Sequence, residues 1–309
     1  MTAALLIVLG IAAAAVGGDL FVRGTVGLAR RLRVAPGIIG ATVAAFATSS
    51  AELSVGINSA VEGSPEIALG DALGSNVVNV GLVLAIAIVL APIRPRRADL
   101  NRDLPVALIA PLMTIGLAGD GTISRLDGGI LLASFAGWLV VTIRQAVRER
   151  DATAAVLAEH DPRRITRDAV IGLVLLVVAG RLIVIAAKDI GTMLGWDTFT
   201  VGALLVAFGT STPELATVVM ARIRGHDEVS VGTVLGSNIF NGLLIIGCAA
   251  VISPIRVATG EVVVAVVVSV LTLLLILPSR SYRLGRGRGF ALLGVYSAYL
   301  AVLLMMQRG

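Results

Sequence analysis

The stretch GIIGATVAAFATSSAELSVGINSAVEGSPEIALGDALGSNVVNVGLVLAIAIVLAPI, residues 37–93, recurs in altered form at residues 199–255. The two copies align without a gap at a constant offset of 162 residues, and 21 of their 57 positions are identical. Two unrelated apolar helices would match one aliphatic residue with another, whereas polar residues also match here. The polar matches pair Thr48 with Thr210, Ser49 with Ser211, Glu52 with Glu214, Ser75 with Ser237, Asn76 with Asn238 and Asn79 with Asn241. The chain therefore contains two related halves.

The composition is that of a membrane protein that crosses the bilayer many times. Of the 309 residues, 57% are hydrophobic and 15% are charged, and the mean hydropathy is +0.95. A spanning helix needs about 20 apolar residues. On that measure we predict an all-α protein with ten spans, at residues 3–22, 37–61, 66–91, 103–119, 126–145, 167–190, 199–222, 229–253, 258–277 and 289–306.

The basic residues predict how these spans are oriented. The odd-numbered loops contain 19 of the 25 lysines and arginines, and short basic loops stay in the cytoplasm. Both termini are therefore expected outside the cytoplasm, and the central loop, residues 146–166, inside. This loop is too short for a Ca²⁺-sensing domain. The histidines His160 and His226 lie in such charged loops and are expected on the solvated surface.

The count of spans also predicts the symmetry of the molecule. Five spans separate a residue from its repeat partner, and because five is odd the halves, residues 1–145 and 167–309, would have opposite orientations in the bilayer. Inverted repeats of this kind are typical of secondary transporters, whose substrate site lies near the midplane between the repeats. Within each repeat, the hydroxyl and carboxylate of Thr48 and Glu52 share one helix face, as do Ser75 and Asn79 on the next.

The chemistry of these faces indicates a cation. A carboxylate inside a bilayer is costly unless it faces a cavity or a counter-charge, and the polar motifs contain no lysine or histidine. Carboxylate, hydroxyl and amide oxygens without imidazole or thiolate suit Ca²⁺ or Na⁺ and fit Zn²⁺ poorly. Two glutamates would neutralise one Ca²⁺.

The motif pair TSSAE…GDALGSNVVN and GTSTPE…GTVLGSNIFN resembles the two alpha-repeats of the sodium/calcium exchanger family. The resemblance implies two inverted five-helix halves around a central group of oxygen ligands, at which Ca²⁺ and Na⁺ compete during alternating access. It implies an antiporter rather than an enzyme, with the transported ions as its only bound ligands. The implied ligands are Thr48, Ser49, Glu52, Ser75, Asn79 and the Ala45 carbonyl, with Thr210, Ser211, Glu214, Ser237, Asn241 and the Ala207 carbonyl from the second repeat.

Three positions depart from the family pattern. The first repeat reads ATSSAE, without the glycine and proline of GTSTPE, so we expect its helix to be less broken. Amides stand at Asn79 and Asn241, where some members have an acid. Asp71 replaces the Thr233 of the second repeat and is either a third carboxylate that favours proton sensitivity or a helix-terminus acid.

Other classes of protein remain as alternatives. An H⁺-coupled Ca²⁺ antiporter or another cation antiporter has the same architecture, and a channel would conduct without countertransport. An intramembrane protease is disfavoured because no predicted span contains histidine and Asp71 has no repeat partner. The basic excess is explained by topology, so no nucleic-acid partner is expected. The arginine-rich, lysine-poor composition and short loops favour a prokaryotic inner membrane, with the lipid bilayer as the surroundings of the protein. We expect a monomer, although the sequence does not fix the oligomeric state.

Overall fold

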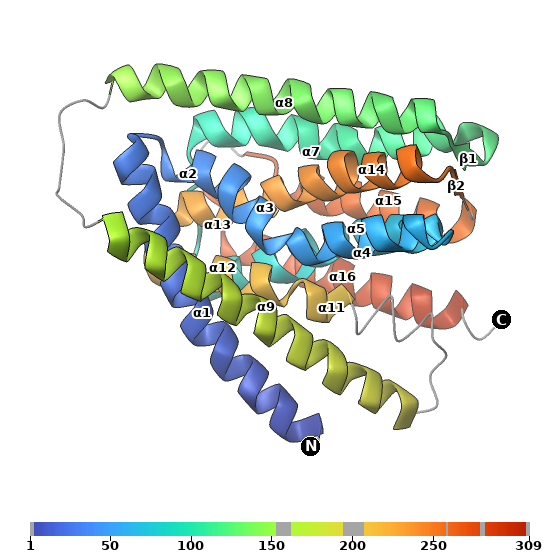
Figure 1. Cartoon of the computed structure of the whole chain (residues 1–309), viewed down its shortest axis with the longest axis horizontal. Coiled ribbons are helices and arrows are strands. Elements are labelled where there is room, and N and C mark those ends of the chain that lie inside the picture. Colours follow the sequence, from blue (N-terminus) through green and yellow to red (C-terminus); the bar gives the residue numbers. More distant parts are fainter. Residues whose placement is uncertain (1–2, 153–161, 194–206, 258, 279–281, 307–309) are drawn as a thin grey trace.

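The computed structural model describes residues 3–152, 162–193, 207–257, 259–278 and 282–306, and these are almost entirely helical (Figure 1). In the first half the elements are α1 (Ala3–Leu32), α2 (Pro36–Ile39), η1 (Gly40–Ala44), α3 (Ala45–Thr48), α4 (Ser50–Val61), α5 (Pro65–Val78), η2 (Asn79–Leu84), α6 (Ala85–Leu90), α7 (Arg97–Leu117), η3 (Ala118–Asp120), β1 (Thr122–Ile123) and α8 (Arg125–Ala152). In the second half they are α9 (Pro162–Met193), α11 (Ala207–Thr210), α12 (Thr212–Ile223), α13 (Asp227–Ile239), η5 (Phe240–Ile245), α14 (Ile246–Ile252), β2 (Ile255–Arg256), α15 (Thr259–Leu275) and α16 (Arg286–Met306).

Positions 162 residues apart adopt the same local structure. The helices α3 and α4 begin and end at the repeat partners of the ends of α11 and α12. Both following turns contain a glycine with positive φ, Gly63 at 79° and Gly225 at 76°, a conformation that glycine adopts without steric cost. The sequence repeat is therefore also a repeat of backbone conformation.

Two short strand contacts extend this correspondence beyond the region of sequence identity. Ile255 in β2 pairs with Ile123 in β1, and Ile93, the repeat partner of Ile255, forms a bridge with Leu284. Each contact joins the residue after a central helix to the segment that precedes α8 or α16. Two equivalent contacts therefore join the halves to each other.

The two most buried spans form the centre of the molecule. In both α5–η2–α6 and α13–η5–α14, 78% of the most apolar stretch is buried, against 22% in α8 and 28% in α16. In each central span a π-helical segment begins at, or one residue before, the predicted ligand Asn79 or Asn241. The central spans therefore hold polar residues of both repeats inside the protein, and the outer helices face the surroundings.

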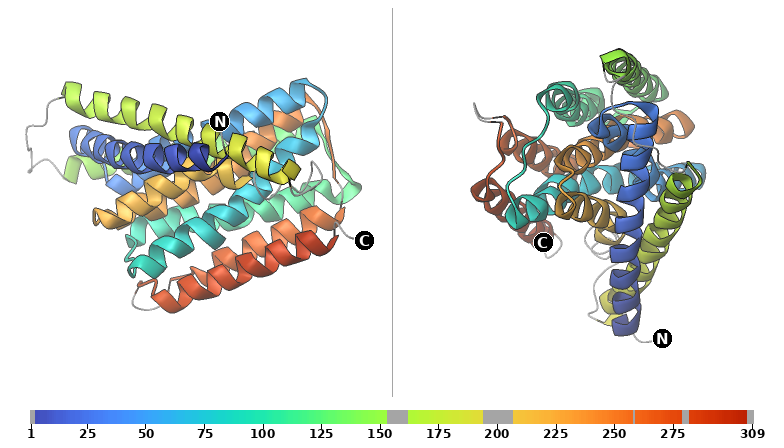
Figure 2. Two further views of the ribbon diagram at one scale, coloured as in Figure 1. Left: turned by 90° about the horizontal axis from the view of Figure 1, so that it is seen from below. Right: turned by 90° about the vertical axis from the view of Figure 1, so that its left-hand side faces the viewer.

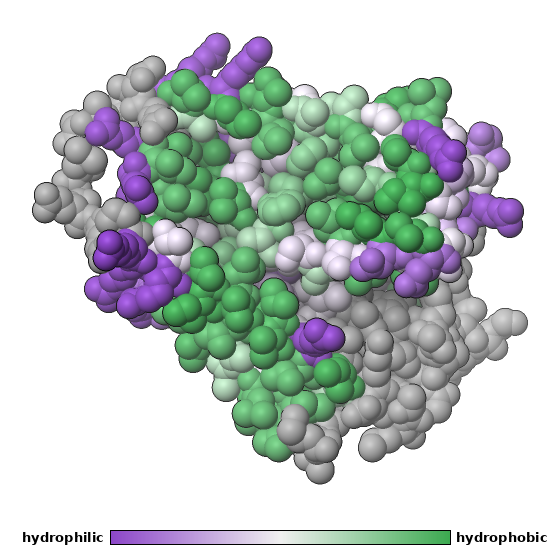
Figure 3. Space-filling model, viewed as in Figure 1, coloured by the Kyte–Doolittle hydropathy of each residue, from purple (hydrophilic) through white to green (hydrophobic). Residues whose placement is uncertain are grey.

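The surface and helix lengths are those of a membrane protein. Among the described residues, six helices are long and apolar enough to cross a membrane, or seven when the bent pair Pro36–Thr48 and Ser50–Val61 counts as one span. Hydrophobic side chains cover the middle of the face in Figure 3, and hydrophilic ones gather at its two ends. Each of the ten predicted spans is mainly helical where it is described; the spans at 199–222 and 258–277 begin outside the described residues. The inverted orientation of the halves and the count of ten spans remain predictions.

The prediction that the first repeat would be less broken is wrong. In the first repeat, the helix that contains Thr48 and Glu52 breaks at Ser49, with φ −82° and ψ 12°. Its counterpart in the second repeat breaks at Ser211, with φ −79° and ψ 5°. The bend between the two helical parts in the first repeat is 48°. Pro213 lies in the first turn of α12, where its missing N–H costs nothing, so the proline follows the break and does not create it.

Helices α1 and α9 lie side by side and extend from the bundle as a pair (Figures 1 and 2). Glycines allow this close approach: a Cβ added at Gly17 would lie 2.9 Å from the Leu175 Cβ, and one at Gly24 would lie 2.5 Å from the Ala169 nitrogen. The α1 helix also packs closely against α12, because a Cβ added at Gly18 would lie 2.9 Å from the Ala216 carbonyl oxygen.

Candidate cation site

A carboxylate of the second repeat is held by hydroxyl groups of both repeats. Glu214 is fully buried in the first turn of α12. Its Oε1 accepts a hydrogen bond of 2.9 Å from the Ser49 hydroxyl at the break of the first repeat, and one of 3.3 Å from the Ser237 hydroxyl. The Thr48 side chain also interacts with this carboxylate. The two helix breaks thus meet at Glu214.

The second carboxylate is equally buried. Glu52, in the first turn of α4, is 1% exposed and close enough to Glu214 for the two to interact electrostatically. The Oε2 atoms of both glutamates are buried without a hydrogen-bond partner among the described residues. Neither glutamate pairs with a basic side chain in that part of the chain. Two acids are therefore buried close to each other without a counter-charge from the described residues, which is costly in either charge state.

The predicted neutral ligands of the central spans are also buried. Ser75, Asn79, Ser237 and Asn241 are each at most 1% exposed. Four of their polar atoms are buried without a hydrogen-bond partner in the described structure: the Ser75 hydroxyl oxygen, the Asn79 Oδ1, and the Oδ1 and Nδ2 of Asn241. Unsatisfied polar atoms are uncommon in a protein interior and mark a place where an unseen ligand or water would supply the partner.

The remaining predicted ligands lie at the helix breaks. Thr48, Ser211 and Thr210 are buried, and the Ser211 hydroxyl has no hydrogen-bond partner among the described residues. The Ala45 carbonyl accepts hydrogen bonds from the Thr48 hydroxyl, at 3.2 Å, and from the Ser49 amide, at 2.9 Å. Ala207 begins α11. The predicted carbonyl ligand of the first repeat is therefore occupied within its own helix in this structure.

Sequence reasoning did not identify one central contact. Asn76 and Asn238, which are repeat partners, donate side-chain hydrogen bonds to each other's backbone carbonyls, at 3.4 Å and 3.2 Å. The Asn79 amide also donates to Asn238 Oδ1, at 3.2 Å. The signal was present, because both asparagines are identical between the repeats, but their spacing does not place them on the face of Ser75 and Asn79.

Comparison with known proteins places this geometry in a family. A family model described as "Sodium/calcium exchanger protein" matches residues 2–144 and 169–305. The chain belongs to the sodium/calcium exchanger family. The family predicted from the two motifs is thereby confirmed.

Relatives of this family member match along nearly its whole length. Inner membrane protein YrbG of Escherichia coli (strain K12) is 31% identical over 98% of the chain and 97% of its own length. Sodium/calcium exchanger MaX1 of Methanosarcina acetivorans is 27% identical over 97% of both chains. A structure of the sodium-calcium exchanger NCX_Mj soaked with Na⁺ and Ca²⁺ superposes with a TM-score of 0.81, at 30% identity, over 97% of this chain and 99% of that one. The chain is therefore a transmembrane protein of an antiporter family for sodium and calcium.

Asp71 lies inside α5, away from either end of the helix, so it is not a helix-terminus acid. It is half-buried on α5, interacts electrostatically with Glu214 and Glu52, and has a buried Oδ2 without a hydrogen-bond partner among the described residues. Within the described chain, no three Asp, Glu, His or Cys side chains are grouped so that they could hold a metal ion.

Proposed function

We propose that this chain exchanges Ca²⁺ for Na⁺ across the membrane, at a single central site built around Glu52 and Glu214. The observation that carries the proposal is the pair of buried carboxylates, one from each repeat, without a basic partner among the described residues. A bound cation is the counter-charge that would make such an arrangement stable, and one Ca²⁺ would neutralise both glutamates.

The neutral groups support the choice of a hard cation. Ca²⁺ takes roughly 6 to 8 oxygen ligands, and Na⁺ also prefers oxygen. The ligands that we propose, beside the glutamates, are the hydroxyls and amides of Thr48, Ser49, Ser75, Asn79, Thr210, Ser211, Ser237 and Asn241, with the carbonyls of Ala45 and Ala207. The relatives named as sodium/calcium exchangers support the same pair of ions.

We infer that the two halves are inverted repeats and that transport proceeds by alternating access. The empty site would leave two carboxylates uncompensated in a low-dielectric interior. The protein would therefore switch between its outward-open and inward-open states only when the site holds a cation. Exchange without leak would follow. The breaks at Ser49 and Ser211 and the π-helical segments η2 and η5 interrupt regular helical hydrogen bonding next to the site, which suits helices that must bend.

We place the protein in a prokaryotic inner membrane with its arginine-rich end in the cytoplasm and both termini outside. The distribution of basic residues supports this orientation, and the match with a relative named as an inner membrane protein supports the location.

Uptake of radiolabelled Ca²⁺ into proteoliposomes tests the proposal. Wild-type protein should accumulate Ca²⁺ when the vesicles are loaded with Na⁺ and diluted into Na⁺-free buffer, and should not do so when they contain K⁺. An inside-acid pH gradient is the second arm. Uptake driven by the pH gradient but not by Na⁺ would replace Na⁺ with H⁺ as the coupling ion, and uptake in neither gradient would refute Ca²⁺ antiport.

A further inference from the structure

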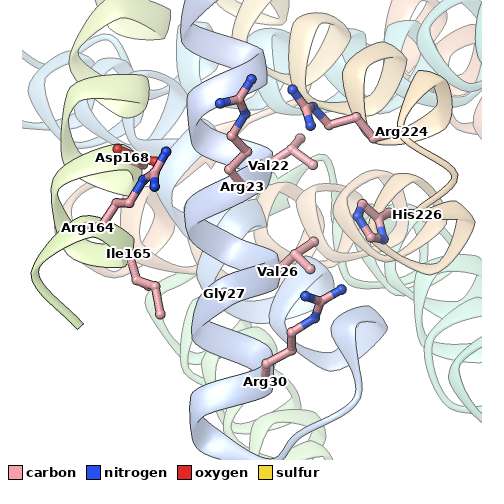
Figure 4. A pocket seen from close by; sticks show the side chains of 10 residues that line it. All are labelled: Val22, Arg23, Val26, Gly27, Arg30, Arg164, Ile165, Asp168, Arg224 and His226. Atoms are coloured by element: carbon pink, nitrogen blue, oxygen red, sulfur yellow. The ribbon is translucent and has the colours of Figure 1, made fainter. Parts of the chain in front are cut away.

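A second polar region lies away from the carboxylate centre. A cavity of about 500 Å³ opens between α1, the first turns of α9 and the connection from α12 to α13 (Figure 4). In that view α1 lies between Arg164 and Asp168 on one side and Arg224 and His226 on the other. These elements belong to the loops that the arginine distribution assigns to the cytoplasmic end. The cavity would therefore lie at the membrane surface and not at the midplane.

The cavity is lined by guanidinium groups from three separate elements. Arg23 and Arg30 come from α1, Arg164 from α9 and Arg224 from the α12–α13 connection. Arg23 pairs with Asp19 at 2.6 Å, and Arg224 pairs with the same carboxylate.

Two of these arginines lack a carboxylate partner in the part of the chain that the structure describes. Arg30 and Arg164 form no ion pair within the described residues. The lining carboxylate, Asp168, is engaged by Arg167 at 2.9 Å. The cavity therefore carries excess positive charge.

His226 contributes a hydrogen-bond donor to the cavity but no permanent charge. The side chain of His226, expected on the solvated surface, is half-buried in the turn between α12 and α13; His160 lies outside the described residues. Burial lowers the pKa of His226, Glu228 opposes this shift, and Arg30 and Arg224 reinforce it. The imidazole is therefore neutral at neutral pH, and the charge of the cavity comes from the arginines.

The walls between the arginines are apolar. Val22, Val26 and Ile165 line the cavity and are each less than a tenth exposed. Just beyond it, the outward faces of α1 and α9 expose Val16, Val170 and Ile171, as expected for helices in contact with lipid tails. A ligand that filled this space would combine an anionic group with an apolar part.

We propose that this cavity binds the phosphate group of an anionic phospholipid, with its glycerol and upper acyl chain against Val22, Val26 and Ile165. Arginine recognises phosphate through paired, charge-assisted hydrogen bonds, and basic pockets between membrane helices at the cytoplasmic side are suited to lipid head groups. Free phosphate shares the anionic chemistry and lacks the apolar part.

An occupant of this cavity would touch three elements at once. Bound lipid would link the α1–α9 pair to the connection that follows α12, the helix of Glu214. Because a ligand that binds the folded protein stabilises it, anionic lipid should raise the melting temperature of the purified exchanger. This inference concerns binding and stability, so it stands or falls independently of the transported ions.

The test compares lipids and arginine variants by thermal melting of the purified full-length protein in non-ionic detergent. Phosphatidylglycerol should raise the melting temperature more than phosphatidylcholine, and inorganic phosphate should neither reproduce nor abolish the effect. In the variant Arg30→Gln/Arg164→Gln, the concentration of phosphatidylglycerol needed for half of the shift should rise about tenfold or more, as expected for the loss of charge-assisted contacts.

The variant Arg144→Gln/Arg148→Gln is the matched control, because it removes the same charge from two exposed arginines of α8. It should behave as wild type. Equal stabilisation by the two lipids, or an equal loss in both double variants, would overturn the proposal. Full protection by inorganic phosphate would also overturn it and reassign the cavity to a free anion. The lipid comparison uses wild-type protein, so it decides the matter even if an arginine variant does not fold.

Discussion

The hydroxyl of Ser49 donates a hydrogen bond of 2.9 Å to Oε1 of Glu214, which lies 165 residues further along the chain. The bond joins the helix break of one repeat to the carboxylate of the other. Its acceptor oxygen is also reached by Ser237 of the second repeat. The position of the Glu214 carboxylate thus depends on both halves of the molecule.

Removal of the Ser49 hydroxyl should weaken cation binding without unfolding the protein. Hydrogen bonds to charged groups contribute about 1.5 to 3 kcal/mol, so Ser49→Ala should raise the KM for Ca²⁺ uptake about tenfold or more. Ser50→Ala is the control, because the only hydrogen bond of the Ser50 hydroxyl among the described residues goes to the Ala47 carbonyl, on the other side of the same break, and not to a carboxylate of the site. An unchanged KM in Ser49→Ala would show that this bond does not orient the carboxylate for binding.

A matched pair of glycines tests the packing between the repeats. A Cβ at Gly232 in α13 would lie 2.5 Å from the Gly37 carbonyl oxygen, whereas one at its repeat partner Gly70 in α5 would meet nothing within 4 Å. Gly232→Ala should therefore destabilise the protein by about 1 to 3 kcal/mol, which is typical of overpacking. Gly70→Ala should be tolerated.

Thermal melting of the two variants in the same detergent measures this difference. The expected order is a clear fall in melting temperature for Gly232→Ala and little change for Gly70→Ala. Equal falls would mean that the helices relax similarly at both positions and that the close contact of α13 is not specific.

The two asparagines of the central pair, Asn76 and Asn238, should also differ in how much their loss destabilises the protein. The side chain of Asn238 takes part in two hydrogen bonds, to the Asn76 carbonyl and from the Asn79 amide, each 3.2 Å long. That of Asn76 makes one bond, at 3.4 Å. Asn238→Ala leaves more buried groups unpaired, at about 1 to 3 kcal/mol for each group, so it should lower the melting temperature more than Asn76→Ala does. The reverse order would contradict the arrangement of these bonds.

The repeat allowed much of the architecture to be predicted from sequence. Identical polar residues at a constant offset placed Ser49 and Glu214 in one site, because polar groups in an apolar chain must come together, but they did not locate the helix breaks. The motif without proline was misleading, since Ser49 adopts a conformation that most residues tolerate and the break needs no proline.

The packing between helices and the buried ion pairs could not be predicted from the sequence. The packing of α1 on α9 depends on glycines such as Gly24, which in a membrane helix do not indicate their partner. The Arg102 side chain is buried with Asp103, to which it pairs at 2.6 Å, and Asp103 also accepts a hydrogen bond of 3.0 Å from the Trp138 indole. Orientation rules predict arginines at helix ends but not which of them become buried, because burial depends on neighbours from distant segments.

The measurement that tests the central claim most directly is equilibrium binding of radiolabelled Ca²⁺ to the purified protein, with and without Na⁺. Wild type should bind one Ca²⁺ per chain, and Na⁺ should displace it. Glu52→Gln and Glu214→Gln should each weaken binding by more than about tenfold, because each removes half of the counter-charge at a buried site. The control, Glu66→Gln, changes an exposed acid at the start of α5 and should bind as wild type does. Unchanged Ca²⁺ affinity in both glutamate variants, or bound Ca²⁺ that Na⁺ does not displace, would contradict the account.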